Sequence, residues 1–125
     1  GKIFVTSHDA EVLSNVPSTH AIWAFDITRE TLLYRLASPT PQVNGHFGQS
    51  IEAKQNRLFV VNQNEILVYD ATSGNFIQTL VLDDYSSNWN FWPMTLSATS
   101  NQLFISMPAF PDETATTLPI NVYVL

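Results

Sequence analysis

The chain has 125 residues, of which 45% are hydrophobic, so its length and composition fit one soluble domain with a core. Its net charge of −6 includes only 5 basic residues, which are scattered along the sequence and predict no basic patch, so no nucleic acid partner is expected. The absence of cysteine excludes disulfides and thiolate zinc sites, and no apolar run approaches the roughly 20 residues that span a bilayer, so we expect no transmembrane segment.

Alternation of apolar and polar residues, with many β-branched and aromatic side chains, predicts an all-β chain without helices. In chain order, the predicted strands are residues 3–7, 21–27, 31–37, 49–53, 57–62, 66–70, 76–82, 94–98, 102–107 and 121–125. Because the first strand begins almost at residue 1, we expect no signal peptide there. Short turns are predicted at residues 54–56, 71–75 and 99–101, and Gly74 is free to adopt a positive φ.

The chain repeats itself at an offset of 45 residues. Residues 47–63 (FGQSIEAKQNRLFVVNQ) align without a gap on residues 92–108 (WPMTLSATSNQLFISMP), and apolar positions meet apolar ones. A third copy lies at the front of the chain, where residues 22–36 match residues 66–80. A period of this length is typical of repeat architectures.

Tandem units of four antiparallel strands predict blades of a β-propeller. We expect one propeller segment over residues 1–125, with about three repeats at 1–46, 47–91 and 92–125. The first and last repeats are incomplete, and three blades are too few to close a ring of roughly four to eight. Further blades, or further copies of the chain, are therefore expected to complete the sheets.

Long connections are predicted to gather at one face of the blades and short turns at the other. The long connections are residues 8–19, 38–46, 83–91 and 110–119. Elaborated loops on a rigid scaffold are where recognition usually resides. The densest polar and aromatic cluster on this face consists of Asp83, Asp84, Tyr85, Asn88, Trp89 and Trp92. Such a cluster suits sugar rings or peptide side chains, although Trp92, like Trp23, is also interpreted as packing between blades.

Other polar residues give no defined chemistry. His8, Asp9 and His20, with Glu11, could ligate a transition metal, but their spacing matches no closed site, so we interpret them as solvated loop groups. Asp26 and Asp70 recur at the end of equivalent strands, which indicates Asx-type turns rather than a catalytic pair. No nucleophile elbow, phosphate loop or zinc signature occurs, and we expect neither catalysis, nor a metal, nor a cofactor.

Residues 38–51 (SPTPQVNGHFGQSI), with 57–61 (RLFVV) and 66–75 (ILVYDATSGN), resemble the FG-GAP repeat of integrin α-subunit-type β-propellers. Phe47 and Gly48 would be the FG element, which Trp92 and Pro93 replace in the last repeat. Many members of that family carry an acidic calcium loop in the first hairpin of the blade. This chain has KQN at residues 54–56 and TSN at 99–101, so calcium is not carried over. Residues 66–80 also resemble repeats of quinone-dependent dehydrogenases.

The FG-GAP resemblance implies a non-catalytic, extracellular or cell-surface adhesion module that binds a protein or a glycan through the long-loop face. Two other functions stay open. Unpaired sheet edges would let copies associate into a ring or a filament. Alternatively, the segment belongs to a propeller enzyme, such as a hydrolase or a quinoprotein, whose catalytic residues lie elsewhere.

Overall fold

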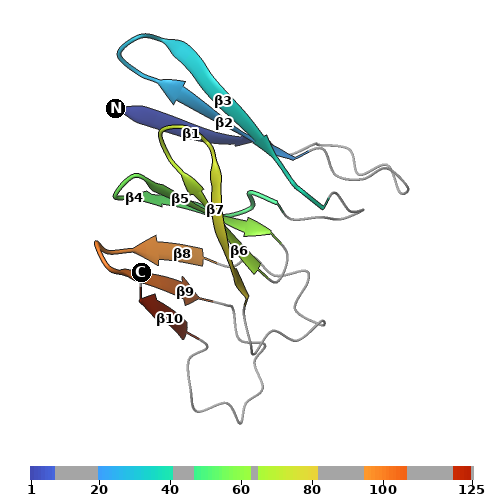
Figure 1. The fold of residues 1–125 in the computed structure, drawn as a ribbon, viewed down its shortest axis with the longest axis vertical. Coiled ribbons are helices and arrows are strands. Elements are labelled where there is room, and N and C mark those ends of the chain that lie inside the picture. The colour runs from blue at the N-terminus through green and yellow to red at the C-terminus, as the bar shows by residue number, and fades with distance from the viewer. Residues whose placement is uncertain (8–19, 41–46, 63–64, 82–94, 107–119, 125) are drawn as a thin grey trace.

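The computed structural model describes residues 1–7, 20–40, 47–62, 65–81, 95–106 and 120–124 (Figure 1). Within these ranges the protein is all-β, with no helix, and thus no helix suited to crossing a membrane. The strands are β1 (Lys2–Ser7), β2 (Ala21–Asp26), β3 (Thr31–Ala37), β4 (Ile51–Lys54), β5 (Arg57–Asn62), β6 (Glu65–Asp70), β7 (Phe76–Val81), β8 (Thr95–Ala98), β9 (Gln102–Ser106) and β10 (Ile120–Val124). All ten predicted strands are confirmed, and no end differs by more than two residues.

The strands form three antiparallel sheets in which neighbours in the chain are neighbours in the sheet. The first sheet has the order β1-β2-β3, the second β4-β5-β6-β7, and the third β10-β9-β8. Within the described residues the three sheets thus hold three, four and three strands. Connections of two to five residues join β2 to β3, β4 to β5, β6 to β7 and β8 to β9, and connections this short can link only antiparallel neighbours.

The second sheet lies between the other two, as Figure 1 shows, and both of its faces are apolar. Side chains alternate between faces along a strand, so Leu58 and Val60 of β5 pack toward the first sheet, whereas Phe59 and Val61 pack toward the third. This explains why β5 has an uninterrupted apolar run. The core thus consists of two layers, one on each side of the second sheet.

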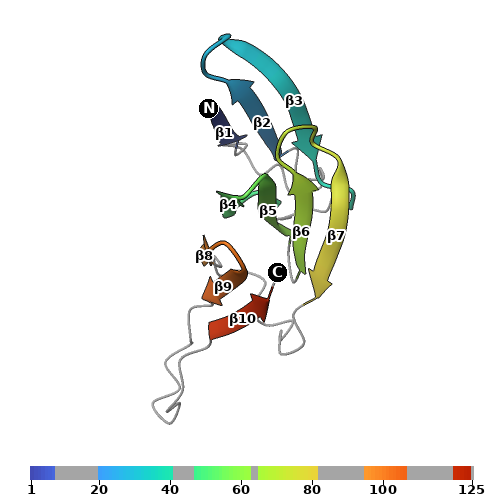
Figure 2. The same ribbon diagram turned by 60° about the vertical axis from the view of Figure 1, so that its left-hand side comes forward.

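The sheets are arranged with equivalent strands on the same side of the stack. Figure 2 shows β1, β4 and β8 along one side and β3 and β7 along the other. Strands β4 and β8 contact each other directly, and most of β7 is exposed. This arrangement of twisted antiparallel sheets is compatible with propeller blades.

Two of the short turns are closed by aspartates, as the sequence predicts. Asp26 Oδ1 accepts a hydrogen bond from the Arg29 backbone N–H at 3.0 Å. Asp70 Oδ1 accepts hydrogen bonds from the backbone N–H groups of Thr72 at 2.9 Å and Ser73 at 2.8 Å. These are Asx-type turns, so the structural interpretation of the recurring aspartates is confirmed.

A buried amide joins the first sheet to the second near the opposite end of the strands. Asn62, the last residue of β5, is only 3% exposed. Its Nδ2 donates to Glu65 Oε1 at 3.0 Å and to Thr40 Oγ1 at 3.4 Å, and its Oδ1 accepts from the Ser38 hydroxyl at 3.2 Å. These bonds satisfy a polar group that would otherwise be costly to bury.

Candidate functional site

The predicted ligand-binding cluster lies outside the described residues. This applies to Asp83, Asp84, Tyr85, Asn88, Trp89 and Trp92. Of the weaker metal candidates, His8 and Asp9 also lie outside, and His20 is half-buried immediately before β2. Among the described residues, no three His, Cys, Asp or Glu side chains are grouped so as to hold a metal ion.

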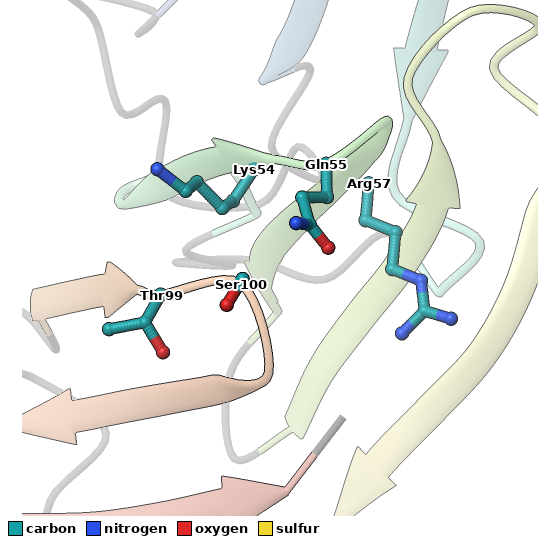
Figure 3. A pocket seen from close by; sticks show the side chains of 5 residues that line it. All are labelled: Lys54, Gln55, Arg57, Thr99 and Ser100. Atoms are coloured by element: carbon teal, nitrogen blue, oxygen red, sulfur yellow. The ribbon is translucent and has the colours of Figure 1, made fainter.

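A polar hollow lies at the short-turn end of the stack, between the second and third sheets (Figure 3). It has a volume of about 220 Å³ and is lined by Lys54, Gln55, Arg57, Thr99 and Ser100. None of these described lining residues carries a carboxylate. The β4–β5 turn supplies one wall and the β8–β9 turn supplies the other, because β4 and β8 contact each other.

A second, more open hollow shares part of the same wall and extends toward the first sheet. Its volume is about 380 Å³, and its lining residues are Lys2, Phe4, Ala53, Lys54, Gln55, Asn56, Arg57 and Ala71. Three of the protein's 5 basic residues therefore line two neighbouring hollows. Stacking of the first sheet on the second thus brings Lys2 to the same hollow as Lys54 and Arg57, which are distant from it in the sequence.

The wall of the smaller hollow is held by a tight hairpin. Gln55 and Asn56 connect β4 to β5 with φ values of 47° and 59°. Two consecutive residues with positive φ match the twist of an antiparallel pair, as in a type I′ turn. The turn places Lys54 and Arg57 directly opposite each other in the two strands.

Hydrogen bonds anchor this hairpin to the neighbouring β6–β7 turn. Asn56 Nδ2 donates to Asp70 Oδ2 at 3.1 Å, and the Ala71 backbone N–H donates to the Asn56 carbonyl oxygen at 2.9 Å. The Thr72 hydroxyl donates to Asn56 Oδ1. Hydrogen bonding, chiefly from the Ser73 backbone N–H, holds the pKa of Asp70 below its ordinary value of 3.8. The Asn56 side chain therefore has a structural role. The side chains of Lys54, Gln55 and Arg57 make no hydrogen bonds within the described residues.

A different kind of surface covers the side of the first sheet that faces away from the second sheet. We call it the outward face, and its members are Ile3, Val5, Trp23, Phe25 and Leu32. Cross-strand pairing aligns Ile3 with Phe25 and Phe25 with Leu32, so these side chains share one face. Ile3, Val5, Phe25 and Leu32 are between 36% and 50% exposed.

Trp23 belongs to the outward face rather than to the core. Ile22 and Ala24 are fully buried toward the second sheet, so alternation directs Trp23 to the other side of β2. The prediction that Trp23 packs between sheets is therefore wrong for the sheets that the structure describes. The Arg35 guanidinium carbon lies 5.3 Å from the ring centroid of Trp23, which is cation–π geometry, and the indole is half-buried.

Four of the five residues of the outward face have buried repeat counterparts on the second sheet, whereas Leu32 matches Phe76, which is 58% exposed. The repeat pairs Ile3 with Leu58, Val5 with Val60, Trp23 with Leu67 and Phe25 with Tyr69. All four counterparts are at most 6% exposed, because the first sheet covers them. The outward face thus has the composition of a covered blade face. The sequence pattern could not reveal which of the two faces lacks a cover.

Comparisons with known proteins agree with the fold and give no family. No family model matches the chain, and no curated protein matches it. Among solved structures, a europium-containing methanol dehydrogenase matches with a TM-score of 0.58 at 9% sequence identity. The match covers 86% of this chain but only 18% of that one. At this identity it shows an all-β arrangement of the same kind, and the FG-GAP resemblance stays a prediction.

Proposed function

We propose that the chain is a non-catalytic interaction module of propeller type, whose outward face binds a further blade-like sheet. One observation carries this proposal: three exposed residues of the outward face, Ile3, Val5 and Phe25, are the repeat counterparts of residues that another sheet buries. Contiguous exposed apolar patches of this kind usually mark interaction surfaces.

The expected occupant is an antiparallel sheet of the same repeat, supplied by a second copy of the chain. The equivalent face of the second sheet is covered by Ile22 and Leu36 of the first sheet, together with Phe47. A partner for the outward face therefore needs an apolar strand pair of similar composition. Phe104 of the third sheet is the repeat counterpart of Phe59 and is half-buried, so the third sheet of another copy offers such a surface.

The native mass of the 125-residue chain in solution tests this proposal. Light scattering is expected to give a particle well above 14.0 kDa. The double substitution Val5→Ser/Phe25→Ser is expected to reduce the mass toward that of one chain. Ile77→Ser is the matched control, because Ile77 is 46% exposed on β7, away from the outward face. A folded monomer that persists at high concentration would contradict the proposal.

We propose that protein or glycan ligands bind through the long connections, in an extracellular or cell-surface setting. The support is the sequence pattern itself: the aromatic and acidic residues around Trp89 occur in a segment that follows a strand end opposite the short turns. The stacked sheets would then act as the rigid support for these loops. This part of the proposal is independent of the outward face.

Part of a propeller enzyme is the second candidate. Its support is the match to a europium-containing methanol dehydrogenase, together with the resemblance of residues 66–80 to dehydrogenase repeats. Because the match covers 18% of that enzyme, activity would require a longer parent chain. Europium-dependent oxidation of methanol by such a parent, measured with an artificial electron acceptor, would favour this candidate. A parent that shows no turnover with europium would remove it.

A further inference from the structure

We propose that the hollow between the β4–β5 and β8–β9 turns is a binding site for a small oxyanion, such as a sulfate, a phosphate or a carboxylate group. This site goes beyond the proposed function, because it lies at the short-turn end and includes no residue of the outward face. The described residues that line it are all polar, and Lys54 and Arg57 are the charged ones among them.

The electrostatics of the hollow favour an anion despite the protein's net charge of −6. Within the described part of the chain, Lys54 and Arg57 form no ion pair and no acidic residue lines the hollow. Lys2 adds a third cation at the adjoining hollow. Asp70 is the cross-strand partner of Arg57, but its carboxylate is held by the β6–β7 turn and forms no ion pair with Arg57. Neighbouring cations raise the local concentration of anions.

The donors available in the hollow match the needs of an oxyanion. Figure 3 shows Gln55 and Ser100 at the middle of the site, with Lys54 and Arg57 on either side. Arginine offers a planar set of N–H donors that suits carboxylate and phosphate oxygens, and lysine contributes a mobile point charge. The Thr99 hydroxyl is committed to its own turn, where it accepts from the Gln102 backbone N–H at 3.2 Å. Ser100 and Gln55 have no such commitment within the described residues.

The volume of the hollow and the rigidity of the β4–β5 hairpin favour a small ligand. A volume of about 220 Å³ lies below the ~300 to 1,000 Å³ that is usual for drug-sized ligands, so one small acidic group fits better than a sugar or a nucleotide. The anchoring of Asn56 to Asp70 and Thr72 fixes the hairpin before any ligand arrives. Such preorganisation lowers the entropic cost of binding.

A titration followed by NMR of the ¹⁵N-labelled chain tests the site. Sodium sulfate, phosphate or acetate would replace sodium chloride at constant ionic strength. We expect saturable shifts of the backbone amides of Gln55, Arg57 and Ser100. The variant Lys54→Gln/Arg57→Gln is expected to bind about tenfold more weakly or worse, since charge-assisted hydrogen bonds are lost. Arg29→Gln is the matched control and should bind as the unmodified chain does, because Arg29 lies in the β2–β3 turn.

Comparing the three anions shows which chemical group the site binds. Saturation by sulfate and phosphate alone would identify a tetrahedral group, and saturation by acetate would identify a carboxylate ligand. Equal shifts in the double variant and in the chain without substitutions would overturn the proposal, as would shifts that never saturate. If the double variant does not fold, Lys54→Gln alone and Arg57→Lys provide the comparison, and unchanged affinity in both would overturn it.

Discussion

The Tyr34 hydroxyl donates a 2.7 Å hydrogen bond to the Ala71 carbonyl oxygen and so joins β3 of the first sheet to the β6–β7 turn of the second. The ring of Tyr34 lies directly over Gly74 of the same turn, where a Cβ would be 2.8 Å from the ring. Burial, with a smaller effect from Asp70, raises the pKa of Tyr34, which keeps the hydroxyl protonated as a donor. Tyr34 is thus one of the contacts, besides the apolar core and Asn62, that hold the two sheets together.

Gly74→Ala is expected to destabilise the fold by about 2 to 4 kcal/mol, as the sum of a backbone and a packing effect. Gly74 has a φ of +77°, which disfavours a Cβ, and the added methyl would overlap the Tyr34 ring. Urea unfolding measures the loss. In a Tyr34→Ala background the same substitution should cost less, because only the backbone effect persists. Equal costs in the two backgrounds would show that the contact contributes nothing.

Asn62→Asp is expected to destabilise the fold at neutral pH by about 2 kcal/mol or more, because it places a buried carboxylate beside Glu65. Asn62 Nδ2 now donates to Glu65 Oε1 at 3.0 Å, and the replacement oxygen would instead repel it. Two adjacent carboxyls raise the pKa of the pair in the folded state above the unfolded value. The lost stability should therefore be partly regained as the pH falls. Asn62→Leu is the control. Its loss of unfolding free energy, measured with urea, should change less with pH because leucine does not titrate.

The strands and turns could be predicted from the sequence because they depend on local patterns. Alternation along β2 and β5, and the side chains of Asp26 and Asp70 at strand ends, follow from a few neighbouring residues. Register and strand order then follow from short hairpins. Gly74 was expected to adopt positive φ, and it does.

The surfaces could not be predicted, because they depend on how the sheets stack. Lys2 and Lys54 are far apart in the sequence, and only the packing of the first sheet on the second brings them to one hollow. The outward face has the same apolar pattern as its covered counterpart, so no sequence signal separates Phe25 from Tyr69. The aromatic cluster around Trp89 lies outside the described residues and stays a prediction.

Acidification is expected to weaken the β6–β7 turn through Asp70. Hydrogen bonds from Ser73 and Thr72 hold its pKa below 3.8, so the carboxylate stabilises the fold above that pH. This contribution is lost as the pH falls through the lowered pKa, which is the usual sign for a hydrogen-bonded carboxylate. Asp70→Asn retains an acceptor oxygen for the turn but no longer titrates. It should therefore lose less stability than the unmodified chain between about pH 6 and pH 3 in urea unfolding.

Glu52→Gln is the matched control for this pH comparison. Glu52 lies in β4, and its carboxyl makes no side-chain hydrogen bond within the described residues. The Glu52→Gln variant should therefore lose about as much stability on acidification as the unmodified chain does. An Asp70→Asn variant with the same acid sensitivity as Glu52→Gln would contradict the assigned role of Asp70. Asp26, whose pKa the Arg29 backbone N–H lowers most, should behave as Asp70 does.

Trp89→Ala is expected to abolish or weaken ligand binding while leaving the unfolding midpoint unchanged. In the ligand-binding interpretation the indole supplies flat apolar area for stacking, and its loss should reduce affinity by about tenfold for a sugar or peptide ligand. A glycan array, followed by titration of the best soluble sugar, measures the change. Trp92→Ala separates the two interpretations of the cluster, because an indole packed between blades would lower stability by about 3 to 5 kcal/mol when truncated. If Trp89→Ala instead unfolds the protein and Trp92→Ala alters only binding, the two tryptophans exchange roles, and the binding surface must be redrawn around Trp92.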